Sequence, residues 1–425
     1  MYRCSGIKYI SLPTKLLENP GLYVFMKKIG LYVLCALLLV QPFHFFVTKY
    51  LFYYREIFAV VFFLLIVQYL LNNLIVLSMR IEVFFILLFL FALILFALFD
   101  PGNNLYEEID YSGEVSETIS DGYLALYVLR NALLYIPMIC YLALRGLSEK
   151  EVKKIAVLVT LVAPISIVAF LYNVGFFPSF NIMEIVSLGG NPLQWNSYVP
   201  YLTFPFIASL YLVIDLRTKL LKLLFIFIGL FLFLYIFVSA SRQSFAFCIL
   251  MALLYAIFVP THKRIHVLLM LISVNLILYF MVNYTLSHYI IHDNLMDRYI
   301  SGAAFIETTR LEIMKDGLLL LNLPEFLLGA GLSSVIISGP HNDFIRWTQR
   351  VGIPGMVLSF LPFFLSLIYF FRFIRQRKMI PILLFIFSAL LFPIYHSFFG
   401  YPREDAYQAL YAFLGIGLWL GISKN

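Results

Sequence analysis

Charged residues are scarce in this chain of 425 residues, since Asp, Glu, Lys and Arg together make up 12% of it. A soluble domain usually has about 25% charged residues and about 45–50% apolar ones. Hydrophobic residues here reach 62%. These proportions exclude an ordinary soluble domain and predict a polytopic membrane protein.

Motifs for metal, redox or nucleotide chemistry are also missing. The sequence has no HExxH motif, no paired CxxC motifs and no GxxxxGK[ST] loop, so zinc hydrolysis, thiol redox chemistry and nucleotide-driven transport have no support. Cys4 lies near the N-terminus and the other cysteines lie within hydrophobic segments, which leaves no external pair for a disulfide. The acidic stretch 107–110 could bind a divalent ion, but a solvated loop explains it more simply. We therefore expect no metal and no cofactor.

Long hydrophobic segments dominate the chain. A helix needs about 20 apolar residues to cross a bilayer core about 30 Å thick. About twelve segments fit, at approximately 29–47, 57–77, 81–99, 122–144, 155–175, 195–214, 221–239, 244–260, 266–283, 351–371, 379–396 and 405–422. The sequence thus predicts an all-α polytopic membrane protein, with residues 1–425 as a single integral membrane domain in the lipid bilayer.

Basic residues set the orientation of these segments, because Lys and Arg are retained in short cytoplasmic loops. With both termini in the cytoplasm, twenty of the thirty Lys and Arg residues fall on the cytoplasmic face. The acidic loop 100–121 has no basic residue and then lies outside. Sidedness and lipid headgroups account for the net charge of +7, so we expect no nucleic-acid partner. Residues 1–28 are too polar and too long to begin a cleaved signal, so the first segment is expected to be an uncleaved span.

One long external loop, residues 284–350, interrupts the hydrophobic pattern. Loops beyond about 12–15 residues are usually functional or disordered. Within this one, FIETTRLEIMKDGLLLL has helical spacing and carries Arg310, and the glycines of LLGAGLSS indicate tight turns. We expect this loop to be folded and to carry catalytic elements.

The stretch HNDFIRWTQRVGIPG closes that loop. Its apolar residues recur with a period near 3.6, which predicts an amphipathic surface helix. Asn342 or Asp343 can cap the helix, and Gly352 with Pro354 would end it before the next span. His341 then lies at its start, either as a functional imidazole or as a plain surface histidine beside a turn.

A second polar stretch, VSASRQS at 238 to 244, reverses the chain between two hydrophobic segments on the external side. Small side chains allow the turn and place Arg242 beside the first N–H groups of the next helix. A guanidinium beside a helix N-terminus can clamp a diphosphate. The alternative is an arginine that reaches the headgroups and anchors a helix end.

Three further features are candidates for substrate contacts, each with a structural alternative. The stretch GGNPLQWNSY places Asn191 where its amide could bind sugar hydroxyls, although Trp195 suits an interfacial anchor. Arg130 lies within the fourth segment, where a charge must face a polar cavity or a partner, and an internal salt bridge is its alternative. His396 and the stretch YPRED, 401 to 405, either line the same cavity or form a solvated turn. We favour the solvated turn.

The remaining functional groups are arginines and a histidine. Arginines can hold a diphosphate and stabilise the charge that develops as it leaves, while a neutral imidazole can accept the proton of an incoming hydroxyl. These residue types therefore suit transfer of a group from a diphosphate leaving group without a metal ion.

The ordered set of SASR, GNPLQWNSY, TTRLEIMKDGLLLL with LLGAGLSS, and HNDFIRWTQRVGIPG resembles the O-antigen polymerase and O-antigen ligase superfamily over about residues 185–420. The resemblance implies an inverting, metal-independent glycosyltransferase of GT-C-like architecture in the bacterial inner membrane. It further implies an undecaprenyl-diphosphate-linked glycan donor, a glycan acceptor and a chain-length regulator protein as partners. Glycine often flanks the Ser-Arg pair in that superfamily, and an acidic residue is common where Gln349 and Arg350 stand here.

The resemblance assigns His341 as the general base and Arg242 and Arg310 as ligands of the donor diphosphate. As further substrate-binding residues we predict Arg130, Asn191 and Asn342. The first 180 residues show no motif that matches the superfamily, so the prediction for Arg130 rests on its position within a span alone.

Three functions remain open from sequence. A polymerase would join lipid-linked repeat units, and we favour it because the external loops are poor in basic residues that would hold a phosphorylated lipid A core. A ligase would move the polymer onto lipid A core. A transporter for a lipid-linked glycan ranks third, because it predicts polar residues near mid-membrane in both halves, whereas the ionisable residues gather at the external surface apart from Arg130.

Overall fold

The computed structural model describes most of the hydrophobic segments. It covers residues 20–43, 54–73, 81–99, 121–173, 192–239, 241–259, 321–331, 342–375, 380–399 and 408–423, together with residues 272, 315, 318 and 319. Every regular element in this described part is helical. The prediction of an all-α chain is confirmed for it.

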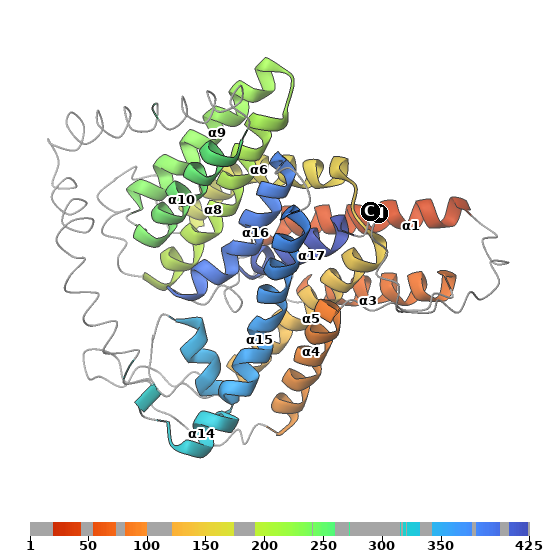
Figure 1. The fold of residues 1–425 in the computed structure, drawn as a ribbon, viewed down its shortest axis with the longest axis vertical. Coiled ribbons are helices and arrows are strands. Elements are labelled where there is room, and N and C mark those ends of the chain that lie inside the picture. The colour runs from red at the N-terminus through yellow and green to blue at the C-terminus, as the bar shows by residue number, and fades with distance from the viewer. Residues whose placement is uncertain are drawn as a thin grey trace, which may run out of the picture.

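Most helices overlap the predicted segments, although α1 begins nine residues before its predicted start at residue 29; Figure 1 shows their arrangement. They are α1 (Pro20–Val40), a short 3-10 turn η1 (Gln41–Phe43), α3 (Tyr54–Asn73), α4 (Ile81–Phe99), α5 (Asp121–Arg145), α6 (Glu149–Asn173), α8 (Pro192–Asp215), α9 (Lys219–Val238), α10 (Arg242–Phe258), α14 (Leu323–Leu328), α15 (Asp343–Arg375), α16 (Pro381–Ser397) and α17 (Ala409–Ile422). The predicted segment 266–283 lies, apart from residue 272, outside the described residues.

Four of the described helices are long and apolar enough to cross a membrane, namely α6, α8, α9 and α15. Shorter apolar helices accompany them, including α10, α16 and α17. The chain is therefore a helical membrane protein. The count of about twelve spans and the GT-C-like architecture stay predictions.

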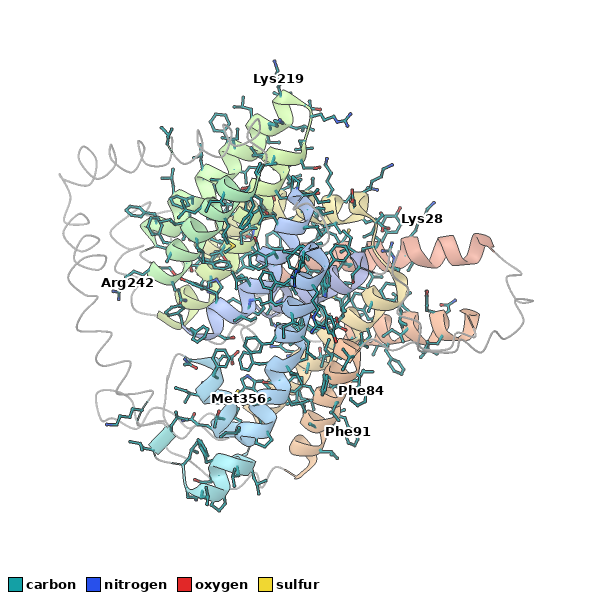
Figure 2. The ribbon with its side chains drawn as sticks, in the orientation of Figure 1. Lys28, Phe84, Phe91, Lys219, Arg242 and Met356 are labelled. Carbon is teal, nitrogen blue, oxygen red and sulfur yellow. The ribbon has the colours of Figure 1, made fainter. Side chains whose placement is uncertain are left out.

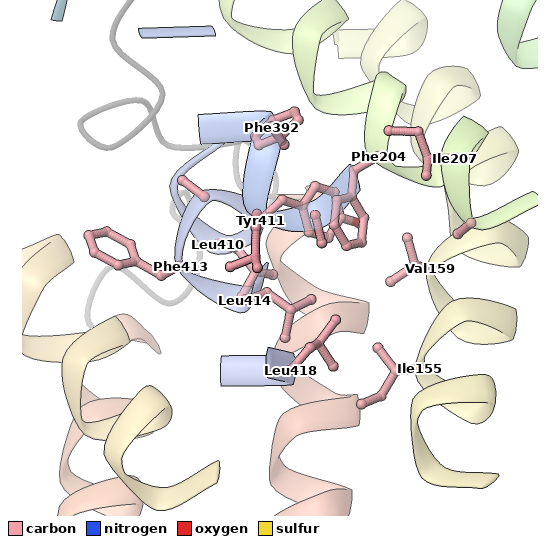
Figure 3. Close-up of a cluster of buried hydrophobic side chains, with 14 of the residues drawn as sticks. Ile155, Val159, Phe204, Ile207, Phe392, Leu410, Tyr411, Phe413, Leu414 and Leu418 are labelled. Atoms are coloured by element: carbon pink, nitrogen blue, oxygen red, sulfur yellow. The ribbon is translucent and has the colours of Figure 1, made fainter. Parts of the chain in front are cut away.

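Two central helices are buried almost throughout where their side chains are described, namely α17 and residues 198–214 of α8. Helix α8 contacts α6, α9, α10 and α16, while α17 contacts α5, α15 and α16. Tyr411 of α17 stacks on Phe204 of α8 with ring centroids 4.3 Å apart. Figure 3 shows this pair above the side chains that α17 and α6 direct toward each other, among them Leu414 and Val159. Close packing of this kind holds membrane helices together, because lipid offers no hydrophobic drive for their association.

Polar contacts link helix ends at both ends of the bundle. At one end the Leu147 N–H donates to the Gly421 carbonyl over 2.9 Å, and Lys153 Nζ lies 2.6 Å from Asp215 Oδ2. All of these residues belong to the face that the basic residues predict to be cytoplasmic. The starts of α10 and α15 both contact the last turn of α16.

Candidate functional site

Helix α10 begins at Arg242, directly after the predicted turn. Ser241 precedes it as the N-cap residue, and its hydroxyl donates to Ser244 Oγ over 2.8 Å. The first backbone bond of the helix runs from the Phe245 N–H to the Ser241 carbonyl over 3.0 Å. The N–H groups of the first turn are therefore left for a ligand or water, as at any helix start.

The Arg242 side chain is half-buried at the edge of the bundle (Figure 2). It forms no hydrogen bond or ion pair with another residue in the part of the chain that the structure describes. Its charge adds to the positive end of the α10 dipole. Such an arrangement attracts anions, which is the chemistry predicted for this residue.

A capped helix starts where the sequence predicts one. Asn342 Oδ1 accepts the N–H groups of Phe344 at 3.0 Å and of Ile345 at 3.2 Å. Of the two predicted caps, the residue used is therefore Asn342, and its oxygen is occupied by the backbone. His341 itself lies outside the described residues, but the cap fixes the chain immediately after it.

The predicted surface position of this helix is wrong. Between its start and Gly352 the side chains of Asp343, Trp347, Gln349 and Arg350 are all buried. Helices α4 and α14 pack on it, and the Trp347 ring lies 5.4 Å from that of Phe89. The 3.6-residue period is real, but its polar side faces protein instead of water.

The helix ends at a kink, as predicted from glycine and proline. Gly352 has φ 69° and ψ 179°, a conformation essentially confined to glycine. Pro354 has no N–H to offer the Arg350 carbonyl. That carbonyl instead accepts the Gly331 N–H at 3.1 Å, and the Gln349 carbonyl accepts the Ala330 N–H at 2.7 Å. Helix α15 therefore consists of a short first helix, 343–351, and a long second one.

The donors to the kink come from the LLGAGLSS stretch. Helix α14 is held by a reciprocal capping box between Asn322 and Glu325, and it ends at Gly329. Gly329 and Gly331 have φ 85° and 116°, which confirms the tight turns predicted for this stretch. The long loop is thus folded against the kink at this point. The predicted helix that carries Arg310 lies outside the described residues, as does Asn191.

The end of α16 brings the starts of α10 and α15 together. Tyr395 Oη donates to the carbonyl of Gln243, the residue after Arg242, over 3.1 Å. Ser397 Oγ donates to Asp343 Oδ2 over 3.1 Å. The arginine of SASR and the segment that follows His341 therefore lie at the same end of the bundle.

His396 is buried and does not belong to a solvated turn, so that expectation is wrong for this residue. Its Nε2 lies 3.4 Å from Thr203 Oγ1. The Thr203 hydroxyl also donates to the Pro200 carbonyl over 2.7 Å, and the tautomer of the imidazole decides whether Nε2 donates to Thr203 or accepts from it. The rings of Phe247 and Phe392 enclose the imidazole. The stretch 401–405 lies outside the described residues.

Arg130 has a carboxylate partner in the structure. Its Nη2 donates to Glu56 Oε2 over 3.0 Å, which is the internal salt bridge considered as its alternative. Beside it, Arg55 is fully buried and its Nη1 donates to Asn131 Oδ1 over 2.9 Å. The sequence patterns did not single out Arg55 or Glu56. The available signal was an Arg-Glu pair at the start of a span, next to a span with an arginine in it.

The fold defines a helical membrane protein in which the starts of α10 and α15 meet at the last turn of α16. The family model for O-antigen ligase matches residues 227–360. This part of the chain is therefore similar to the O-antigen ligase family, which confirms the resemblance to the O-antigen polymerase and ligase superfamily. The matched range includes Arg242, Arg310, His341 and Asn342, and excludes Arg130 and Asn191. Neither a curated protein nor a solved structure matches the chain.

Proposed function

We propose that this protein is an inverting, metal-independent glycosyltransferase that polymerises undecaprenyl-diphosphate-linked repeat units into O-antigen or a related surface polysaccharide. The observation that carries the proposal is the meeting of two helix starts within the family domain. One bears Arg242, and the other begins at Asp343, two residues after His341; both contact the last turn of α16.

The chemistry assigns one role to each group. Arg242 and Arg310 hold the donor diphosphate, and bidentate guanidinium contacts suit its oxygens. His341 accepts the proton of the acceptor hydroxyl, whose oxygen forms a bond to the anomeric carbon of the donor. The bond from that carbon to the diphosphate oxygen breaks, and its electron pair leaves with the diphosphate. A single displacement from the opposite side inverts the anomeric configuration.

The alternative acceptor is lipid A core, which would make the protein an O-antigen ligase. The description of the matching family model favours this candidate. Both functions need the same base and the same diphosphate clamp, because both break the same donor bond. The bacterial inner membrane, with the site on its periplasmic face, is the location proposed for either one. A chain-length regulator is a proposed partner of the polymerase.

Reconstitution separates the two. The purified full chain in lipid nanodiscs is given a lipid-linked repeat unit, with and without lipid A core, and products are resolved by gel electrophoresis. A polymerase builds a ladder from the repeat unit alone, whereas a ligase forms product only with lipid A core. His341→Ala should abolish either product. A His341→Ala variant that keeps wild-type activity would refute the proposed base, and the absence of any new glycosidic bond under both conditions would refute the transferase.

A further inference from the structure

The last turn of α16 contacts three different helices through three consecutive residues. Successive side chains on a helix are about 100° apart, so Tyr395, His396 and Ser397 point in three directions. Tyr395 reaches the Gln243 carbonyl of α10 at 3.1 Å, His396 reaches Thr203 of α8 at 3.4 Å, and Ser397 reaches Asp343 of α15 at 3.1 Å. We call these three residues the α16 hub.

The contact between Ser397 and Asp343 is buried on both sides. Ser397 shares its single hydroxyl proton between Asp343 Oδ2 and the Pro393 carbonyl of its own helix, the latter at 2.7 Å. A hydrogen bond to a buried carboxylate is stronger than one between neutral groups. It therefore fixes where the chain enters the first helix of α15, two residues after His341.

The contact between Tyr395 and Gln243 is supported by aromatic packing. The Phe247 ring of α10 lies 4.7 Å from the Tyr395 ring and 5.1 Å from the His396 ring. Phe247 is one turn along α10 from Gln243, so the hydroxyl and the ring hold the same first turn. This turn begins with Arg242.

His396 fixes the hub itself. Its bond to Thr203 and its position between Phe247 and Phe392 seat the end of α16 against α8, a helix buried along most of its length. The contacts of Tyr395 with α10 and of Ser397 with α15 therefore begin from a fixed helix end. Loss of the Tyr395 contact would move only the start of α10, and loss of the Ser397 contact would move only the start of α15.

We propose that Tyr395 and Ser397 are positioning residues, Tyr395 for Arg242 and Ser397, through Asp343, for His341. The inference rests on the proposed function, because those two residues have catalytic roles only there. Arg242 binds the diphosphate before and during the reaction, whereas His341 acts only in the chemical step. The loss of each contact must then affect a different kinetic constant.

The experiment measures kcat and KM for the lipid-linked donor with the full chain in nanodiscs. Tyr395→Phe should raise KM roughly tenfold with little change in kcat, and Ser397→Ala should lower kcat roughly tenfold with little change in KM, since small displacements of reacting groups cost about this much or more. Ser397→Thr keeps the hydroxyl and should restore kcat.

Matched controls remove the same atoms elsewhere. Ser209→Ala deletes a buried hydroxyl that donates to the Phe206 carbonyl of its own helix at 2.6 Å. Tyr211→Phe deletes a hydroxyl that makes no hydrogen bond to another described residue, on a ring stacked 5.2 Å from Phe385. Both controls should leave kcat and KM within about twofold of wild type, because neither hydroxyl contacts the α16 hub or the starts of α10 and α15.

Hydrogen exchange provides a readout that does not depend on activity. Ser397→Ala should speed amide exchange in residues 342–347 and leave residues 242–247 unchanged, and Tyr395→Phe should do the reverse. If both variants match their controls in kinetics and exchange, the proposal is overturned. If the wild-type protein forms no glycosidic bond, the proposed function fails on its own, and exchange that stays unchanged in both segments still overturns the hub.

Discussion

Gly329 and Gly352 lie against each other's chain so closely that neither has room for a side chain. A Cβ on Gly352 would overlap the Leu327 carbonyl, and a Cβ on Gly329 would overlap the Arg350 carbonyl. Both residues also have positive φ. The contact between α14 and the kink of α15 is therefore one of backbone on backbone, supported by the N–H groups of residues 330 and 331.

Substitution of Gly352 by alanine should unfold this contact. The backbone conformation alone costs a non-glycine residue about 1–3 kcal/mol, and the overlap with backbone adds to that cost because backbone atoms cannot rotate away. We expect Gly352→Ala to lower the thermal unfolding temperature in detergent and to remove activity.

Gly417→Ala is the matched control for this substitution. Its Cβ would meet the end of the Leu142 side chain, 2.8 Å from Cδ1, and a flexible side chain can move. It should therefore unfold at a clearly higher temperature than Gly352→Ala. Equal unfolding temperatures for the two variants would show that the kink tolerates a side chain.

Sequence alone predicted much of this kink and little of its surroundings. Gly352 and Pro354 are local signals, since one allows positive φ and the other lacks an N–H, and the Asn342 cap is equally local. The burial of Gln349 and Arg350 was not predictable. A helical period shows that one face is polar, but only the packing of α4 and α14 determines what that face meets.

The same distinction applies to the candidate site. Hydropathy placed the helices because crossing a bilayer depends on composition. The contacts of His396 with Thr203 and of Arg130 with Glu56 join residues far apart in the sequence, so no local pattern contains them. The role of α16 as a hub was missed for that reason.

Asn342 can be tested for two roles at once. Loss of an N-cap costs about 0.5–2 kcal/mol, and aspartate caps as well as asparagine does. We therefore expect Asn342→Ala to lower stability by about that amount and Asn342→Asp to restore it. If Asn342 also binds the glycan through its amide, Asn342→Asp should still show a raised KM, since the carboxylate cannot donate. Restored stability together with a wild-type KM would exclude the predicted substrate contact.

The pair of Arg130 and Glu56 offers a test by charge exchange. Glu56 is partly exposed but Arg130 is mostly buried, so removing either charge should lower stability by leaving the other without this partner. The double variant Arg130→Glu with Glu56→Arg should recover the thermal stability that each single reversal loses. If Arg130 binds substrate, as predicted from its position, the exchanged protein should recover stability without recovering activity. If the exchanged protein recovers its thermal stability and also its activity in the reconstituted assay, the pair is purely structural.

Arg242 is the residue whose substitution most directly tests the diphosphate clamp. A hydrogen bond to a charged group contributes about 1.5–3 kcal/mol, so Arg242→Ala should lower kcat/KM for the lipid-linked donor by about 10- to 100-fold. The kcat/KM of Arg242→Lys should lie between those of the wild type and of Arg242→Ala, because an ammonium keeps the charge and loses the planar fork.

Arg372 provides the control. It lies near the last turn of α15 and is exposed, and its guanidinium lies 5.5 Å from the Tyr369 ring. Arg372→Ala removes the same charge from the predicted cytoplasmic end and should leave kcat/KM unchanged. If Arg242→Ala and Arg372→Ala gave the same kinetic constants, the arginine of SASR would be an anchor for a helix end, and the diphosphate would have to be bound elsewhere.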